Sequence, residues 1–198
     1  MYPKSLQNLI ESFKYLPGIG EKTAKRLAFS VLDFENEKTE FFIQSLKSVN
    51  NNIGRCPKCN MIIENNKCLM CNDINRNKEV MCVVEDPRNL FLIEDLQTFN
   101  GVYHVLDGLI SPLDGINPED IGLEKLLQRV KNEKLKELIL AFKPSIEGET
   151  TSLYIKSILE GIDIKITKLA SGVPMGADME YLDTLTLENA LKERKEIT

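Results

Sequence analysis

The chain has 198 residues, of which 42% are hydrophobic and 28% charged, a composition that predicts a folded globular protein and excludes a disordered or fibrous one. It contains no apolar run of about 18 residues and no apolar segment after Met1, so we expect a cytoplasmic protein without a membrane span or secretory signal. The net charge of -5 divides into +3 for residues 1–79 and -8 for residues 80–198, which permits phosphate binding in the first part and favours basic protein partners for the second.

The N-terminal part has the pattern of three helices. Apolar residues at helical spacing from Leu6 to Phe13 predict a first helix that ends near Tyr15, with Ser5 as its N-cap. The same spacing recurs from Ala24 to Val31 and predicts a second helix. A third amphipathic helix is expected from about Lys38 to Val49.

The connection between the first two predicted helices, Leu16-Pro17-Gly18-Ile19-Gly20, resembles the core of a helix-hairpin-helix motif. Its two glycines let the backbone turn sharply and expose N–H groups where the dipole of the next helix adds positive potential. A DNA phosphate could bind there without any base contact, and nearby cations would add attraction. The alternative is that the glycines only shape a turn. The candidate DNA-binding residues are Gly18, Gly20, Lys22, Lys25 and Arg26.

Four of the five cysteines form two Cys-x-x-Cys pairs, Cys56 with Cys59 and Cys68 with Cys71. This gap lets both sulfurs of a pair point at one ion, so four thiolates would complete a closed tetrahedral site for structural zinc. The metal would supply folding energy to a segment poor in large apolar residues. Disulfides are disfavoured in a reducing compartment, and a redox dithiol would need only one pair. Cys82, inside an apolar strand, is expected to be a buried small side chain.

From residue 80 onward, short apolar runs alternate with helical patterns, which predicts a parallel sheet with helices on both faces. The single histidine, His104, lies in one of these runs and is expected to be structural. The fold class is therefore α/β, with a small all-α N-terminal domain and a zinc finger. The expected strands are residues 80–84, 102–106, 138–142 and 162–169, followed by a loop at 171–178 and a helix at 187–195.

The first predicted strand ends at Glu85, at the edge where open α/β sheets bind ligands. This segment resembles the start of a Toprim domain, the fold shared by topoisomerases and bacterial primases, in which this glutamate and a later Asp-x-Asp bind magnesium. Here Lys143 and Ser145 stand where those aspartates would be. A lysine ammonium repels magnesium, and no Walker A sequence provides an NTPase instead. We therefore expect no catalytic activity; a Toprim-type magnesium-dependent nuclease or primase-like enzyme is the alternative.

Taken in this order, the parts resemble the RecR family of recombination mediators over essentially the whole chain. Asp107 departs from the family pattern, which usually has glycine there, and Lys143 stands where asparagine is usual. The other stretches that carry the resemblance are residues 103–108, 110–115, 144–149 and 172–187. The expected domains are residues 1–53 (helix-hairpin-helix, DNA binding and oligomerisation), 54–78 (four-cysteine zinc finger), 79–172 (Toprim) and 173–198 (signature loop and helix).

The resemblance implies a ring-shaped tetramer that encircles single-stranded, double-stranded or gapped DNA without sequence preference. It implies RecO and RecF as partners and the loading of RecA onto single strands in recombinational DNA repair. Because the Toprim surface contacts RecO in that family, Glu85, Glu147 and Glu149 are assigned to partner binding. A zinc-ribbon transcription or translation factor is a second alternative, and it would require base-specific contacts.

Overall fold

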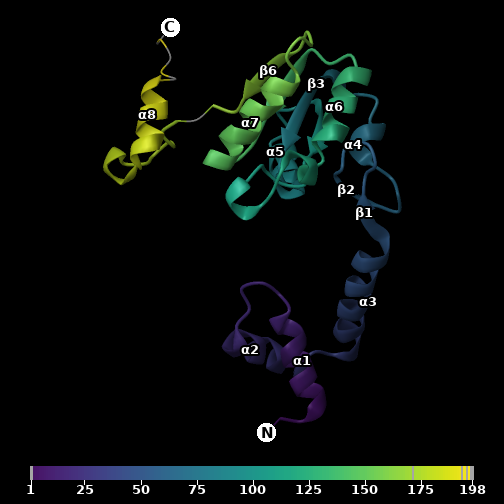
Figure 1. Ribbon diagram of the computed structural model, residues 1–198. Helices are drawn as coiled ribbons and strands as arrows, with labels where there is room; N and C mark the ends of the chain where they lie inside the picture. The colour runs from purple at the N-terminus through teal and green to yellow at the C-terminus, as the bar shows by residue number, and fades with distance from the viewer. Residues whose placement is uncertain (1, 171, 193, 195, 197–198) are drawn as a thin grey trace. The chain divides into compact units, whose positions relative to one another are not determined.

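A computed structural model describes residues 2–170, 172–192, 194 and 196 of the chain. By its internal packing the chain divides between Ile53 and Gly54 into two compact units. The first unit contains the purple and dark blue helices of Figure 1, and the second contains the parallel sheet and its helices. Among the described residues, no helix is both long and apolar enough to cross a membrane.

The first unit is helical, as expected. Its elements are α1 (Lys4–Lys14), α2 (Glu21–Leu32) and α3 (Asn36–Asn52). The first two helices pack through Ile10, Ala24 and Ala28, whose side chains are at most 2% exposed. Two alanines at this contact let the helix backbones approach closely, because no long side chain separates them.

Two details of the first unit differ from the sequence-based expectation. Ser5 is not the N-cap of α1, because the helix already begins at Lys4 after Pro3, and no side chain caps it. The third helix is confirmed but longer than expected, and the apolar side chains of Phe42 and Val49 on it are 40% and 62% exposed. None of the described side chains of α3 is buried.

The second unit is built on a four-stranded sheet in which every neighbouring pair of strands is parallel. Its strands are β3 (Asn77–Val84), β4 (Gly101–Val105), β5 (Glu137–Leu140) and β6 (Lys165–Lys168), in the order β4-β3-β5-β6. The principal helices between them are α5 (Pro87–Asp95), α6 (Leu123–Asn132) and α7 (Ile146–Ile158), which flank the sheet in Figure 1. The predicted α/β class with a parallel sheet is confirmed.

Alternate side chains of β3 serve two different cores, as the pleat of a strand requires. Met81 and Val83 belong to the core formed with α6 and α7. Cys82 and Val84 belong to the core formed with α5 and with the cysteine segment. Helices therefore cover one face of the sheet, whereas a helix and the cysteine segment share the other. Burial raises the pKa of the Cys82 thiol to about 12, which keeps it neutral.

The remaining elements are short. They are β1 (Ile53–Arg55), β2 (Ile62–Glu64), α4 (Leu69–Asn72), the 3-10 turns η1 (Pro112–Asp114), η2 (Pro118–Ile121) and η3 (Met179–Tyr181), and α8 (Thr184–Lys192). Two of them, η1 and η2, lie between β4 and β5 in sequence, and the others precede or follow the sheet. The predicted terminal helix is present but begins at Thr184 instead of residue 187. Ser171 and Lys195, which bounded the predicted loop and helix, lie outside the described residues.

The β4 strand is an edge of the sheet, and three side chains bond its outward-facing carbonyl groups. Arg76 Nη1 donates to the carbonyl of Gly101 at 3.1 Å, and Arg129 Nη1 donates to that of Tyr103 at 2.7 Å. Asn60 Nδ2 donates to the carbonyl of Val105 at 3.0 Å. An open edge would invite pairing with another chain, so these donors close a surface that is otherwise prone to association.

His104 is a buried, neutral residue on the α6 side of β4. Its ring is 1% exposed, and its Nδ1 lies 3.2 Å from Arg129 Nη1. Because a guanidinium can only donate, Nδ1 accepts and the ring proton resides on Nε2. Burial, reinforced by the charge of Arg129, lowers the pKa of His104 to about 3.

We expect the imidazole of His104 to stay neutral in the folded protein down to about pH 4. Its pKa falls from an unfolded value of about 6.5 to about 3, so the unfolded chain takes up a proton that the folded chain does not. The contribution of neutral His104 to the free energy of unfolding is fully present above about pH 6.5 and is lost as the pH falls toward 3. As the chain has one histidine, its NMR signal is unambiguous; a folded-state signal that titrates near pH 6.5 would contradict this.

Candidate metal centre and nucleic-acid interface

The first cysteine pair is presented by a tight backbone turn. The N–H of Cys56 donates to the carbonyl of Met61 at 2.8 Å, and the N–H of Asn60 donates to the carbonyl of Cys56 at 2.9 Å. Asn60 adopts the left-handed conformation with φ 60°, which asparagine tolerates better than most residues. This turn directs the sulfurs of Cys56 and Cys59 into the interior of the finger, where both residues are buried.

The second pair lies at the start of a short helix. Cys68 precedes α4, and its sulfur accepts a hydrogen bond from the backbone N–H of Cys71 at 3.3 Å. Burial nevertheless raises the pKa of the Cys68 thiol to about 11, and this hydrogen bond offsets only part of that effect. The helix therefore places Cys71 one turn away on the same side as Cys68.

The four cysteine sulfurs lie close enough together to bind one metal ion. All four lie within 4.8 Å of one another, with 3.9 Å between Cys56 and Cys71 and 3.5 Å between Cys59 and Cys68. Zinc–sulfur bonds of about 2.3 Å would give sulfur–sulfur edges of about 3.8 Å, so the cluster fits zinc. In the described part of the chain, no other group of three or more His, Cys, Asp or Glu side chains is arranged this closely.

The protons of this cluster are unevenly shared. The pKa of Cys71 is lowered to about 5, first by its hydrogen bond with Cys59 and then by those with Cys68 and Cys56. The pKa of Cys59 is raised, because its thiol is the donor to Cys71 and because it is buried. A metal ion that binds all four sulfurs must therefore displace protons from the others, and its affinity rises with pH.

The hairpin between α1 and α2 places both candidate glycines immediately before the uncapped start of α2. Gly18 has φ 80°, which favours glycine, and Gly20 precedes α2 without any side-chain cap. The first N–H groups of α2 have no partner within the helix and point outward. A side chain added at either glycine would meet no other atom, so the protein's own packing does not require this open space.

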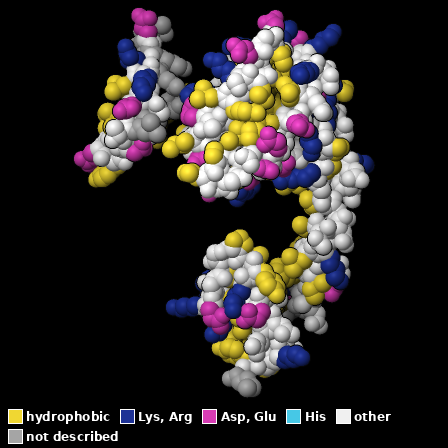
Figure 2. Space-filling view, viewed as in Figure 1, with side chains coloured by type: hydrophobic (Ala, Val, Ile, Leu, Met, Phe, Trp, Pro, Cys, Tyr) yellow, Lys and Arg dark blue, Asp and Glu magenta, His cyan; other side chains and the backbone are white. Residues whose placement is uncertain are grey.

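The cations around the hairpin are not equivalent. Lys25 forms an ion pair with Glu21 at 2.9 Å, and Lys14 binds the same carboxylate at 3.2 Å. Lys22 and Arg26 are exposed and form no ion pair with any of the described residues. Figure 2 shows basic and acidic side chains together at the surface around α2. The predicted set of three cations is therefore present, but the charge of one is already compensated.

The structure brings Glu85 close to the β5–α7 loop. Its Oε1 accepts a hydrogen bond from the backbone N–H of Lys143 at 3.3 Å, and its buried Oε2 has no partner among the described residues. Ser145 caps α7, with its Oγ accepting from the N–H of Gly148 at 3.2 Å. Both positions that hold aspartates in Toprim enzymes are thus used to shape this loop.

The two other acidic candidates differ in their surroundings. A hydrogen bond with Ser145, followed by one with its own backbone N–H, lowers the pKa of Glu147, and the charge of Lys143 contributes to this. Glu149 points elsewhere and is paired with Lys168 of β6 at 2.9 Å. Glu85 and Glu147 therefore each interact with the β5–α7 loop, Glu85 through Lys143 and Glu147 through Ser145, whereas Glu149 is paired with β6.

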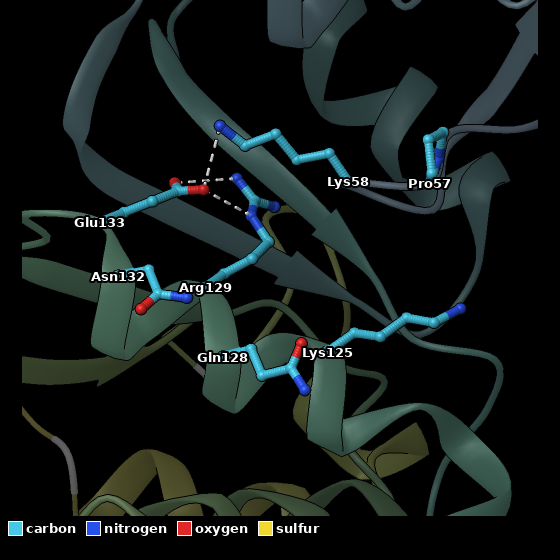
Figure 3. A pocket seen from close by; sticks show the side chains of 7 residues that line it. All are labelled: Pro57, Lys58, Lys125, Gln128, Arg129, Asn132 and Glu133. Carbon is cyan, nitrogen blue, oxygen red and sulfur yellow. Dashed lines mark hydrogen bonds and ion pairs between the residues drawn. The ribbon is translucent and has the colours of Figure 1, made fainter.

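Several residues around the metal centre were not predicted from the sequence. Arg129 of α6 and Glu133, the C-cap residue of this helix, form an ion pair that also reaches Lys58 in the first cysteine turn, as the dashed lines of Figure 3 show. Their i, i+4 spacing was a signal for a pair, but not for the involvement of Lys58. Asp107, which departs from the family pattern, accepts a hydrogen bond from the Asn60 amide at 2.9 Å. It has no left-handed backbone, so its turn tolerates the substitution.

Comparison with known proteins accounts for nearly the whole chain. The family model "RecR, helix-hairpin-helix" matches residues 6–49, "Toprim domain" matches residues 79–170, and "RecR, C-terminal" matches residues 172–195. The sequence is 45% identical over 196 residues to the recombination protein RecR of Staphylococcus aureus (strain Newman), covering 99% of both chains. The same identity and coverage hold for the recombination protein RecR of Staphylococcus haemolyticus (strain JCSC1435).

We expect the purified protein to contain about one zinc ion per chain. Cys59→Ser should abolish this content and lower the melting temperature, because zinc binding supplies folding free energy to the finger. Cys82→Ala, which alters a buried cysteine outside the cluster, should retain the metal. Elemental analysis of dialysed protein measures the zinc content of both variants, and thermal unfolding measures the melting temperature. A Cys59→Ser protein with a full complement of zinc would show that the cluster is not the metal site.

Proposed function

The chain belongs to the RecR family of recombination proteins, and from this premise we propose that it is a non-catalytic, DNA-binding mediator of recombinational DNA repair. It would act with RecO and RecF to load RecA at gapped or single-stranded DNA. The observation that carries the proposal is the uncapped start of α2 behind Gly18 and Gly20. Free N–H groups, open space and exposed cations meet at that point.

Binding through this hairpin would be independent of DNA sequence. Backbone N–H groups, Lys22 and Arg26 can all bind phosphate oxygens, which carry no information about the bases. One hairpin would neutralise only a few phosphates, so a single copy would bind weakly. We propose a ring-shaped tetramer, in which several linked hairpins raise the effective concentration of each contact. The exposed apolar side chains of α3 offer a surface for such association.

The absence of catalysis is proposed from the ligand set at the carboxyl ends of β3 and β5. Glu85 is present there, but Lys143 contributes its N–H to that carboxylate, and Ser145 caps a helix. Magnesium-dependent phosphoryl transfer needs several carboxylates that converge on the metal. The alternative, a Toprim-type nuclease or primase-like enzyme, would lack two of these ligands.

The same loop is the proposed contact for RecO. The buried Oε2 of Glu85 has no partner in the described part of the chain, and leaving such an oxygen unsatisfied is costly. A basic side chain of RecO could bind the carboxylate of Glu85, and Glu147 in the first turn of α7 would add negative charge. Glu149, already paired with Lys168, would contribute less to such a contact.

We expect Lys22→Ala/Arg26→Ala to weaken DNA binding more than Lys25→Ala does, because only Lys25 is compensated by Glu21. The affinity of the double variant for duplex DNA should depend less on salt, with the slope of log K against log salt reduced by up to about 0.9 per lost phosphate contact. Electrophoretic mobility shifts at several salt concentrations measure this. Unchanged affinity and slope in the double variant would refute the hairpin as the DNA site.

We expect Glu85→Gln to weaken RecO binding about tenfold, because a charged contact becomes a neutral one. Glu149→Gln, which removes a carboxylate already paired within the chain, should change the affinity less than about twofold. Calorimetric titration of each variant with RecO distinguishes these outcomes. Equal affinities for wild type and Glu85→Gln would exclude this loop as the contact.

A further inference from the structure

The first cysteine turn is connected to α6 by a chain of charged contacts. Lys58, which lies between Cys56 and Cys59, donates from its Nζ to Glu133 Oε1 at 3.0 Å. Arg129 binds the same carboxylate, with Nε 3.1 Å from Oε1 and Nη2 3.2 Å from Oε2. Figure 3 shows Lys58 extending from the finger to the side chains of Arg129 in α6 and Glu133 at its C-terminal end.

Arg129 is held so firmly that it can serve as a fixed anchor for this carboxylate. Its side chain is only 8% exposed, and its Nη1 donates to the carbonyl of Tyr103 and lies against His104. A planar guanidinium that is bonded on both edges has little freedom to rotate. Glu133 is therefore fixed by a buried cation on one side and presents its carboxylate to a surface cation on the other.

The finger also meets the same edge of the sheet through its backbone. The N–H of Val105 donates to the carbonyl of Cys59 at 2.9 Å, and the Asn60 amide bonds the carbonyl of Val105. A cysteine ligand and its two neighbours in sequence are thus bound to β4 and α6. The orientation of the first cysteine pair depends on contacts that lie outside the finger.

We propose that Glu133, held by Arg129, is a positioning residue for the metal centre, because it binds Lys58 and so fixes the first cysteine turn in the geometry that zinc requires. This inference rests on the proposed zinc site. Groups outside the ligand shell commonly set metal affinity by orienting the ligands, and their loss costs about 10- to 100-fold when they bind a ligand directly. Glu133 acts through Lys58, so a smaller effect is expected here.

Electrostatics alone predicts that loss of the Glu133 charge changes zinc affinity in the opposite direction, so the two explanations can be distinguished by experiment. Four thiolates around one zinc ion carry a net charge of -2, so removing a nearby carboxylate should favour that state and tighten zinc binding. Positioning predicts that Glu133→Gln weakens zinc binding, because Lys58 and the turn lose their anchor. The direction of the change therefore decides between the two roles.

The test is zinc affinity, measured by competition with a chelator for the full-length chain. Glu133→Gln and Lys58→Met should each weaken zinc affinity about three- to tenfold. The double variant should bind zinc as well as either single variant, because both substitutions break the same Lys58–Glu133 ion pair. Lys58→Arg, which keeps the cation, should stay near wild type. Glu124→Gln, an exposed glutamate of the same helix without an ion pair in the described structure, is the matched control.

A second measurement separates positioning from general destabilisation. If Glu133→Gln lowers the melting temperature of metal-loaded and metal-free protein equally, it changes folding but not zinc affinity, and the proposal is wrong. Affinity equal to or tighter than wild type would also overturn it. Failure of the wild-type chain to bind zinc at all would instead refute the metal site itself, and the DNA-binding proposal would stand unaffected.

Discussion

The free backbone groups at the outward edge of β4 need hydrogen-bond partners, and several segments of the second unit supply them. An edge strand presents unpaired carbonyl groups, which pair readily with any other strand. In this protein the carbonyls of Gly101, Tyr103 and Val105 accept hydrogen bonds from Arg76, Arg129 and Asn60. These donors come from the end of the cysteine segment, from α6 and from the first cysteine turn.

Closure of this edge makes the finger part of the sheet domain instead of an appended module. The finger cannot build a large apolar core, so its shape depends on a metal ion or on its contacts with β4 and α6. Asn60 takes part in both, because its left-handed backbone completes the cysteine turn while its amide bonds Val105 and Asp107. Metal site and strand edge are therefore consequences of the same local geometry.

At the carboxyl ends of the strands, the fold has retained the Toprim framework while its polar groups serve other contacts. The N–H of Lys143 binds Glu85, and a side chain at Gly148 would come within 2.2 Å of the Lys143 carbonyl, so the loop packs tightly against the start of α7. The N–H of Lys143 and the hydroxyl of Ser145 are used within this loop, which supports the proposal that it does not coordinate magnesium. The DNA contacts that we propose lie in the other unit, where repetition in an oligomer would strengthen them.

The sequence by itself determined the helices, the parallel strands, the hairpin glycines and the set of four clustered cysteines, because each depends on local spacing or on the chemistry of one short segment. It also indicated that Lys143 replaces a metal ligand. The i, i+4 spacing of Glu21 and Lys25 already permitted their ion pair. Only the tertiary structure decided that Glu149 is paired with Lys168 and that Lys58 reaches Glu133. Both of these pairs join distant parts of the chain and depend on which side chains the fold brings within hydrogen-bonding distance, which residue spacing alone does not encode.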